Sequence, residues 1–241
     1  MFTGVPIIYG LNPKSTQTTA QHALGTMGVT SDGRMFRYAQ NAGVEIGAGL
    51  LCVAADITTN HEDMELNTYA VGDKTLDITL GGTAVVGNEY QEGFVMVVDS
   101  AGEGHYHKMK SAPAQSNTTG TFTPILYDPI EVAADANTTV TIVRNKYRDV
   151  VVSDRTLADL PVGVCPIVIP VDAYFWVQKK GYCTILVDSN NTTAGQPITI
   201  GDNGSGAVEL HDAATEVIVG HQPVGANSDA GEYGIYILNL E

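Results

Sequence analysis

The sequence predicts an all-β protein, a β-sandwich, β-barrel-like or β-tulip domain that carries an extended N-terminal arm. Glycine (26 residues) and proline (10 residues) recur along the chain, and no window of about a dozen residues has a sustained apolar stripe at helical spacing. Short apolar runs separated by turn residues dominate instead. Roughly a dozen such runs in about 200 residues is the strand density of sandwiches and barrels.

Length and charge narrow the functional classes. The 241 residues suffice for one large β domain or two small ones. The 12 Lys and Arg residues and 27 Asp and Glu residues give a net charge of -15, which repels phosphate backbones, so no nucleic-acid partner is expected. No stretch approaches the roughly 18 apolar residues of a membrane span, so no membrane partner is expected. The first residues lack the basic and apolar regions of a signal peptide, so classical secretion is not expected.

Residues 1–43 are interpreted as the extended arm. Their first half is polar and rich in Thr and Gln, with no periodic apolar face. Such a segment frays unless something holds it, so we expect another copy of the chain or a different protein to clamp it. Arg34, Phe36, Arg37 and Tyr38 are the candidate interface residues, because Arg and aromatic side chains dominate interface hot spots. The alternative is that Phe36 and Tyr38 simply begin the first β-strand.

A β-rich domain is expected over residues 44–155, and a second β-rich region, separate from or interleaved with the first, over residues 156–241. The break between them coincides with the one helix candidate, Asp154–Leu160, which Pro161 ends. The expected strands are Leu50–Ala54, Thr75–Leu80, Phe94–Asp99, His105–Lys110, Thr121–Leu126, Thr138–Val143, Val164–Ile169, Tyr174–Gln178, Thr184–Asp188, Gln196–Ile200, Glu216–Val219 and Tyr233–Leu240.

Two of these strands have a clear internal pattern. The alternation in Thr75–Leu80 places Leu76, Ile78 and Leu80 on a core face. The glycine-containing turn Asp99–Gly104 predicts a hairpin that joins Phe94–Asp99 to His105–Lys110.

No catalytic, metal-binding or cofactor-binding site is expected. His105 and His107 have metal-ligand spacing but lack the further ligands that zinc requires. The His/acid clusters His61–Asp63 and His211-Asp212 lie in polar stretches without a nearby nucleophile motif. Gly201–Gly206 lacks the residues of a phosphate or calcium loop and is interpreted as a turn. The cysteines, Cys52, Cys165 and Cys183, are interpreted as small buried apolar residues.

A series of segments spans most of the chain in a characteristic order. The segments are Leu24-Gly25-Thr26 with Ser31-Asp32-Gly33-Arg34-Met35-Phe36-Arg37-Tyr38-Ala39, then Asn88-Glu89-Tyr90-Gln91-Glu92-Gly93-Phe94, Gly102-Glu103-Gly104 with Lys108-Met109-Lys110-Ser111, Tyr174-Phe175-Trp176-Val177-Gln178, and Gly231-Glu232-Tyr233 with Leu238-Asn239-Leu240. Together they resemble the capsid decoration, or cement, proteins of tailed bacteriophages, which are encoded alongside the major capsid protein. The chain departs from that pattern at Lys179-Lys180-Gly181-Tyr182-Cys183, where similar chains have a less charged turn.

The resemblance implies a virion structural protein that is made in the host cytoplasm and lies on the outer capsid surface. It implies a homotrimer that bridges neighbouring subunits of the major capsid protein and stabilises the shell, without enzymatic activity or a cofactor. The residues leave a second function open, a glycan-binding adhesin or receptor-binding module that uses Tyr174 and Trp176 as a stacking platform on one strand face. The alternative for these two side chains is burial in the core.

Overall fold

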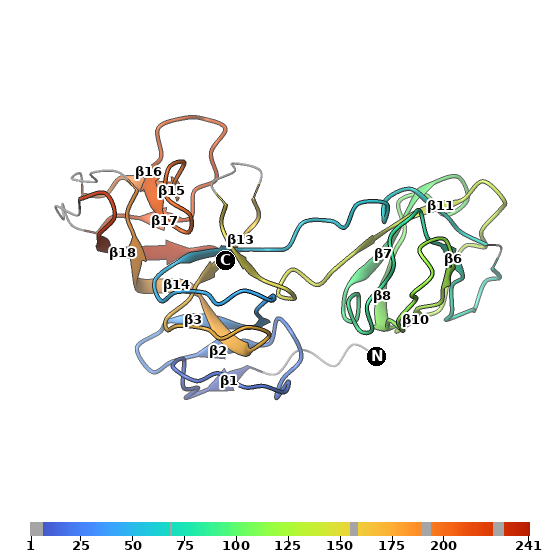
Figure 1. Ribbon diagram of the computed structural model, residues 1–241, viewed down its shortest axis with the longest axis horizontal. Helices are drawn as coiled ribbons and strands as arrows, with labels where there is room; N and C mark the ends of the chain where they lie inside the picture. Colours follow the sequence, from blue (N-terminus) through green and yellow to red (C-terminus); the bar gives the residue numbers. More distant parts are fainter. Residues whose placement is uncertain (1–6, 68, 155–158, 189–193, 224–228) are drawn as a thin grey trace. The chain divides into compact units, whose positions relative to one another are not determined.

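The structure is a computed structural model that describes residues 7–67, 69–154, 159–188, 194–223 and 229–241, and its chain divides into two compact units (Figure 1). Unit 1 comprises residues 1–55 and 146–241. Unit 2 comprises the intervening residues 56–145 and is therefore an insertion in the sequence of unit 1.

The chain thus divides at other places than the expected boundaries at 43/44 and 155/156. The physical reason is strand pairing, because β4 (Leu51–Val53) pairs with both β12 (Val151–Val152) and β13 (Pro161–Val164). The compositional break around Ser153–Pro161 therefore lies inside unit 1. The helix candidate Asp154–Leu160 falls mostly on residues 155–158, which lie outside the described residues.

Unit 1 is organised around one 11-stranded sheet. Eight strands follow the order β1-β2-β3-β14-β18-β17-β15-β16. β13 joins this sheet beside β14, β4 pairs with β13, and β12 pairs with β4. The bounds of the strands not given above are β1 (Ile8–Tyr9), β2 (Met27–Val29), β3 (Met35–Gln40), β14 (Tyr174–Leu186), β15 (Pro197–Ile200), β16 (Val208–Leu210), β17 (Gly220–His221) and β18 (Tyr233–Asn239).

Strand β14 connects the parts of this sheet. Its first half pairs antiparallel with β3, from Tyr174 opposite Gln40 to Lys180 opposite Met35. Its second half pairs antiparallel with β18, from Lys180 onward. The register shifts between Gln178 and Lys180, which is a β-bulge that redirects the strand. Figure 1 shows β14 running from beside β3 to beside β18.

The described part of the expected arm, residues 7–43, is built into this sheet. It contains β1, β2 and β3, which lie in consecutive positions at one end of the strand order. The irregular segment before β2 is held as well, because Gln17 and Tyr174 exchange backbone hydrogen bonds of 2.9 and 2.8 Å. The clamp expected from another chain is therefore supplied by the chain's own sheet.

Tyr38 is the centre of the aromatic core that holds this segment. Its ring stacks on Tyr174 at 5.9 Å and meets Trp176 edge-on at 5.1 Å between ring centroids. Its hydroxyl donates to Gln17 Oε1 at 3.0 Å and accepts from the Gln21 N–H at 3.1 Å. A fully buried tyrosine whose hydroxyl is satisfied in this way fixes both the sheet and the loop that crosses it.

Unit 2 has a five-stranded sheet, β10-β8-β7-β11-β5, and a two-stranded sheet, β6-β9. Leu76, Ile78 and Leu80 are buried in its core, as their alternation predicted. The predicted hairpin is also confirmed, because β7 and β8 pair antiparallel around the glycine-containing turn. The strands are β5 (Met64–Glu65), β6 (Ile78–Thr79), β7 (Phe94–Asp99), β8 (Tyr106–Ser111), β9 (Thr121–Phe122), β10 (Ile125–Leu126) and β11 (Thr139–Val143).

The predicted all-β class is confirmed. Every regular element among the described residues is a strand, and the sheets they form are open. In unit 1, adjacent residues enter different cores: Leu51 and Val164 lie in one apolar cluster, while Cys52 and Cys165 lie in another. Since neighbouring side chains of a strand point to opposite faces, the sheet has a core on each side, which is a sandwich-like arrangement.

Replacement of Tyr38 by Phe tests how the N-terminal segment is anchored. The variant keeps the ring but removes both hydroxyl hydrogen bonds, so we expect the free energy of unfolding to fall by about 1–2 kcal/mol in urea denaturation. Tyr9→Phe, at a side chain that is 76% exposed, is the control and should change nothing. Equal stability of the Tyr38→Phe variant and the parent would contradict this anchoring.

Candidate functional site

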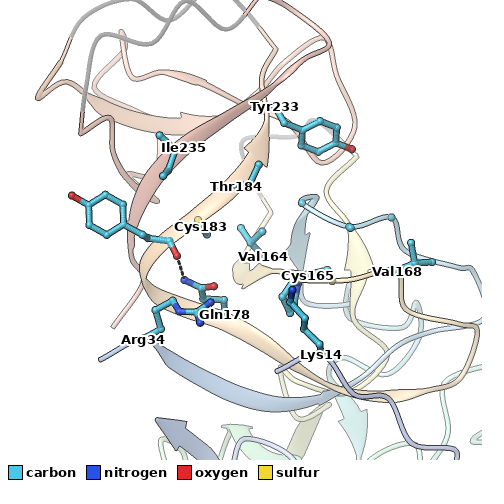
Figure 2. A pocket seen from close by; sticks show the side chains of 15 residues that line it. Lys14, Arg34, Val164, Cys165, Val168, Gln178, Cys183, Thr184, Tyr233 and Ile235 are labelled. Atoms are coloured by element: carbon cyan, nitrogen blue, oxygen red, sulfur yellow. Dashed lines mark hydrogen bonds between the residues drawn. The ribbon is translucent and has the colours of Figure 1, made fainter. Parts of the chain in front are cut away.

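A surface groove of about 810 Å³ lies in unit 1 beside the second half of β14. In Figure 2 the side chains of Tyr233, Ile235 and Thr184 line one part of it, and Val168 and Cys165 line another. This docking groove is formed by Lys14, Arg34, Gly47, Ala48, Gly49, Val164, Cys165, Pro166, Val168, Gln178, Tyr182, Cys183, Thr184, Tyr233 and Ile235.

Large apolar side chains around the docking groove are exposed to solvent. Tyr182 is 57% exposed, Tyr233 52%, Val168 50% and Ile235 45%. Apolar side chains gathered around one concave surface, and not scattered singly, are characteristic of binding sites. Covering them would release apolar surface from water and supply binding free energy.

Two glycines allow the docking groove to keep its shape. Gly49 has a φ of +72°, and a Cβ atom there would lie 2.7 Å from the Tyr233 ring and 3.2 Å from the Thr184 carbonyl oxygen. Gly181 has a φ of +91°, and a Cβ atom there would lie 2.9 Å from Cγ of Arg34. Both positions combine a left-handed backbone with close neighbours, so side chains there are disfavoured.

The docking groove contains a free piece of strand edge at Thr184. The Leu186 N–H bonds to the Gly49 carbonyl at 3.0 Å, and the Tyr182 carbonyl accepts from Gln178 Nε2 at 2.8 Å, so these alternate residues direct backbone groups away from β18. Thr184 lies between them and faces the same way, because backbone groups in an antiparallel strand alternate. Among the described residues its N–H and C=O have no hydrogen-bond partner on that side, and the residue is exposed.

Two cations add charge to this apolar surface. Lys14 and Arg34 both line the docking groove of a chain whose net charge is -15. The Arg34 guanidinium is 2.8 Å from Asp32 and lies 5.7 Å from the Phe36 ring centroid. The arrangement therefore offers apolar contact, backbone hydrogen bonds and the positive charge of Lys14, beside an Arg34 that is already paired with Asp32, and together these suit an extended segment with acidic residues.

The four predicted interface residues fall into different environments. Arg34 lines the docking groove, so its surface position is compatible with the predicted role. Phe36 and Tyr38 are fully buried within the chain's own aromatic core, which corrects their assignment as contact residues for a partner. They lie in a strand, as the alternative interpretation proposed, but this strand is β3 and not the first strand of the chain. Arg37 makes a bidentate ion pair with Glu241, at 2.6 and 2.9 Å, and donates to the Gly25 carbonyl at 2.9 Å.

The sugar-stacking interpretation of Tyr174 and Trp176 is not supported by their positions. Trp176 is only 3% exposed and packs against Tyr38 and His22. A stacking platform needs an accessible ring face, and this ring has its faces covered. The core interpretation of Trp176 is therefore the one that the structure supports.

Packing explains two of the candidate histidines, His61 and His107. His61 is fully buried, with Nδ1 2.6 Å from the Tyr90 hydroxyl and Nε2 2.9 Å from the Thr83 carbonyl, so both ring nitrogens are used in the core of unit 2. The rings of His105 and His107 are 6.5 Å apart, and burial lowers the pKa of His107, with a further contribution from His105. His107 and Met109 are buried on one face of β8.

One cluster that the sequence did not reveal lies at the turn after β15. One carboxylate oxygen from each of Asp188, Asp202 and Glu209 lies within 4.8 Å of the other two. The Asp188 carboxylate also accepts a hydrogen bond of 2.7 Å from the Asn203 N–H. Burial raises the pKa of Glu209 to about 7, and the neighbouring carboxylates, beginning with Asp202, contribute. The expected turn at Gly201–Gly206 is present, but its contact with Asp188 and Glu209 arises from strand pairing and has no local sequence signal.

No family model, curated protein or solved structure matches this chain. The described part of the chain has no helical segment with the length and hydropathy of a membrane span.

Replacement of Glu209 by Gln tests the cost of burying this carboxylate beside the carboxylates of Asp202 and Asp188. The folded-state pKa of about 7 lies above the ordinary 4.5, so folding favours the protonated form, and this contribution to stability is lost as the pH rises through 7. We expect the variant to unfold like the parent at pH 4.5 and to be more stable by about 1 kcal/mol at pH 8, since solvent screens this partly exposed group. Urea denaturation at both pH values measures the difference.

Glu45→Gln, at an exposed carboxylate of unit 1, is the control. The same stability difference at both pH values would contradict the assignment.

Replacement of Lys179 by Met tests a buried cation near the Arg37–Glu241 pair. Lys179 is 1% exposed, and burial, followed by the charge of Lys146, lowers its pKa from 10.5 to about 8. The charged form therefore destabilises the fold below pH 8, and this cost disappears as the pH rises toward 10.5. We expect the variant to be more stable by about 2 kcal/mol at pH 7.

This gain in stability should disappear at pH 10.5. The control, Lys180→Met at the exposed neighbouring residue, should show neither effect. A destabilised Lys179→Met variant at pH 7 would contradict this account.

Proposed function

We propose that this chain is a virion structural protein, a capsid decoration protein that binds the outer surface of an assembled phage shell through the docking groove. The observation that carries the proposal is the coincidence of exposed apolar walls, an open strand edge at Thr184 and two cations in one concave surface. The order of segments that resembles decoration proteins supplies the identity of the partner, the major capsid protein.

The occupant proposed for the docking groove is an extended segment of the major capsid protein that carries acidic and apolar residues. The free backbone groups of Thr184 would hydrogen-bond to that segment, as in strand addition. Ile235 and Val168 would contact its apolar side chains, while Lys14 and Arg34 would face its carboxylates.

Such binding would stabilise the shell by mass action. A protein that binds assembled subunits and not free ones shifts the equilibrium toward the assembled state. We propose a homotrimer, in which three grooves act together, so that weak single contacts add through their effective concentration. Bridging of neighbouring subunits follows if the three grooves hold different subunits.

The variant Ile235→Asp tests this function because it places a carboxylate in the apolar wall. The assay uses shells assembled from the major capsid protein that is encoded alongside this chain. The parent chain should co-sediment with these shells. The variant should bind them at least roughly tenfold more weakly, because burial of an unpaired charge is costly. Ile218→Asp is the matched control: Ile218 is 47% exposed and lies in unit 1 away from the groove lining, against 45% for Ile235.

Two outcomes would contradict the proposal. A parent chain that does not co-sediment with shells at micromolar concentration would remove the proposed partner. Unchanged binding of Ile235→Asp would place the contact elsewhere on the chain. Light scattering of the free chain tests the trimer separately, with an expected mass of about three times the chain mass of 25.5 kDa.

A further inference from the structure

Two of the cysteines lie in contact inside unit 1. The Sγ atoms of Cys52 and Cys165 are 3.0 Å apart, although 113 positions separate the residues in the sequence. Both side chains are fully buried in the same apolar cluster. The third cysteine, Cys183, is half-buried and its sulfur lies 3.9 Å from the Tyr236 carbonyl oxygen.

The backbone around this pair is fixed from several directions. Cys52 lies in β4, opposite Gly163 of β13, and Cys165 directly follows β13. The Cys165 N–H donates to the Leu50 carbonyl at 3.1 Å, and its carbonyl accepts from the Gly49 N–H at 2.7 Å. A disulfide has an S–S distance of about 2.0 Å, so the two sulfurs must approach by only about 1 Å more.

We propose that Cys52 and Cys165 are a disulfide-forming pair, which closes when the folded or folding chain meets a small-molecule disulfide such as oxidised glutathione. One cysteine thiolate attacks the disulfide of oxidised glutathione and releases a glutathione thiolate. The second cysteine thiolate then attacks the mixed disulfide and releases the other. The two cysteines lose two protons and two electrons, and one oxidised glutathione becomes two reduced glutathione molecules.

The environment of the pair determines how fast the bond forms. Burial, reinforced by the neighbouring Cys52, raises the pKa of the Cys165 thiol well above its ordinary value. Thiolate is the reactive species, so exchange is slow in the folded chain at neutral pH and accelerates at higher pH or while the strands are forming. The bond is expected outside the cell, because reducing cytosol keeps such pairs as thiols.

The bond would have a specific consequence for this topology. Cys52 precedes the insertion and Cys165 follows it, so the closed covalent loop contains all of unit 2, residues 56–145. β4, the last strand before the insertion, and the end of β13, the second strand after it, would be tied together beside the docking groove, which Cys165 lines. A long closed loop restricts the unfolded chain and so stabilises the fold.

The test uses the full chain in a Cys183→Ala background, so that only the pair remains. One sample is kept folded and another is refolded from denaturant, both in glutathione buffers of graded redox ratio at pH 8. Each is then denatured with excess N-ethylmaleimide and weighed by mass spectrometry. We expect two maleimide adducts under reducing conditions and none under oxidising conditions in the refolded sample. Peptide mapping should find residue 52 joined to residue 165.

A second variant and a second readout separate the bond from a general effect of oxidation. Cys52→Ala in the same background has one thiol and cannot close the loop. Limited proteolysis within unit 2 should leave the two flanking pieces of the oxidised chain joined on a non-reducing gel, and the Cys52→Ala chain in separate pieces. Two maleimide adducts at every redox ratio in both samples, or two glutathione adducts in place of the disulfide under oxidising conditions, would overturn the proposal.

Discussion

The antiparallel pairing of β14 is the interaction on which unit 1 depends. This strand has 13 residues, against a common strand length of about 5–6. It pairs with β3 before the bulge at Lys179 and with β18 after it. Because β3 and β18 come from opposite ends of the chain, β14 joins the N-terminal and C-terminal segments into one sheet. Trp176 of β14 also packs against Tyr38 of β3, so the same strand supplies the backbone pairing and the aromatic core.

The docking groove follows from the same strand. Where β14 continues past Lys180 it pairs with β18 on one side, and at Thr184 its other side is open to the surface. Gly49 and Arg34 approach this open edge from distant parts of the sequence without covering it. The long strand that connects the parts of the sheet thus has a short unpaired edge. Unpaired strand edges are the places where a sheet pairs with a strand from a partner. The proposed binding site therefore exists because β14 extends beyond the strands that pair with it on one side.

Local alternation predicted much of the fold. Two features were predicted correctly: the strand Phe94–Asp99 and the core face formed by Leu76, Ile78 and Leu80. Both depend on side-chain alternation and turn residues, which are patterns of neighbouring positions in the sequence. The continuity of β14 was not predicted, since Lys179-Lys180-Gly181 has the composition of a turn, and pairing of β14 with β3 and β18 overrides that signal. The expected strand Glu216–Val219 lies just before the short β17, and Val164–Ile169 is displaced to β13. Of the candidate site, Arg34 was predicted, whereas the open edge at Thr184 depends on pairing between distant segments.

β14 is a continuous, paired strand with one open position, Thr184, in its second half. Residue-resolved amide hydrogen exchange of the free chain measures this pattern of pairing. We expect slow exchange at Cys183 and Ile185, whose N–H groups face β18, and much faster exchange at Thr184 between them, whose N–H faces the groove. Equal protection at all three amides would contradict the open edge. Equally fast exchange at all three would contradict the strand itself.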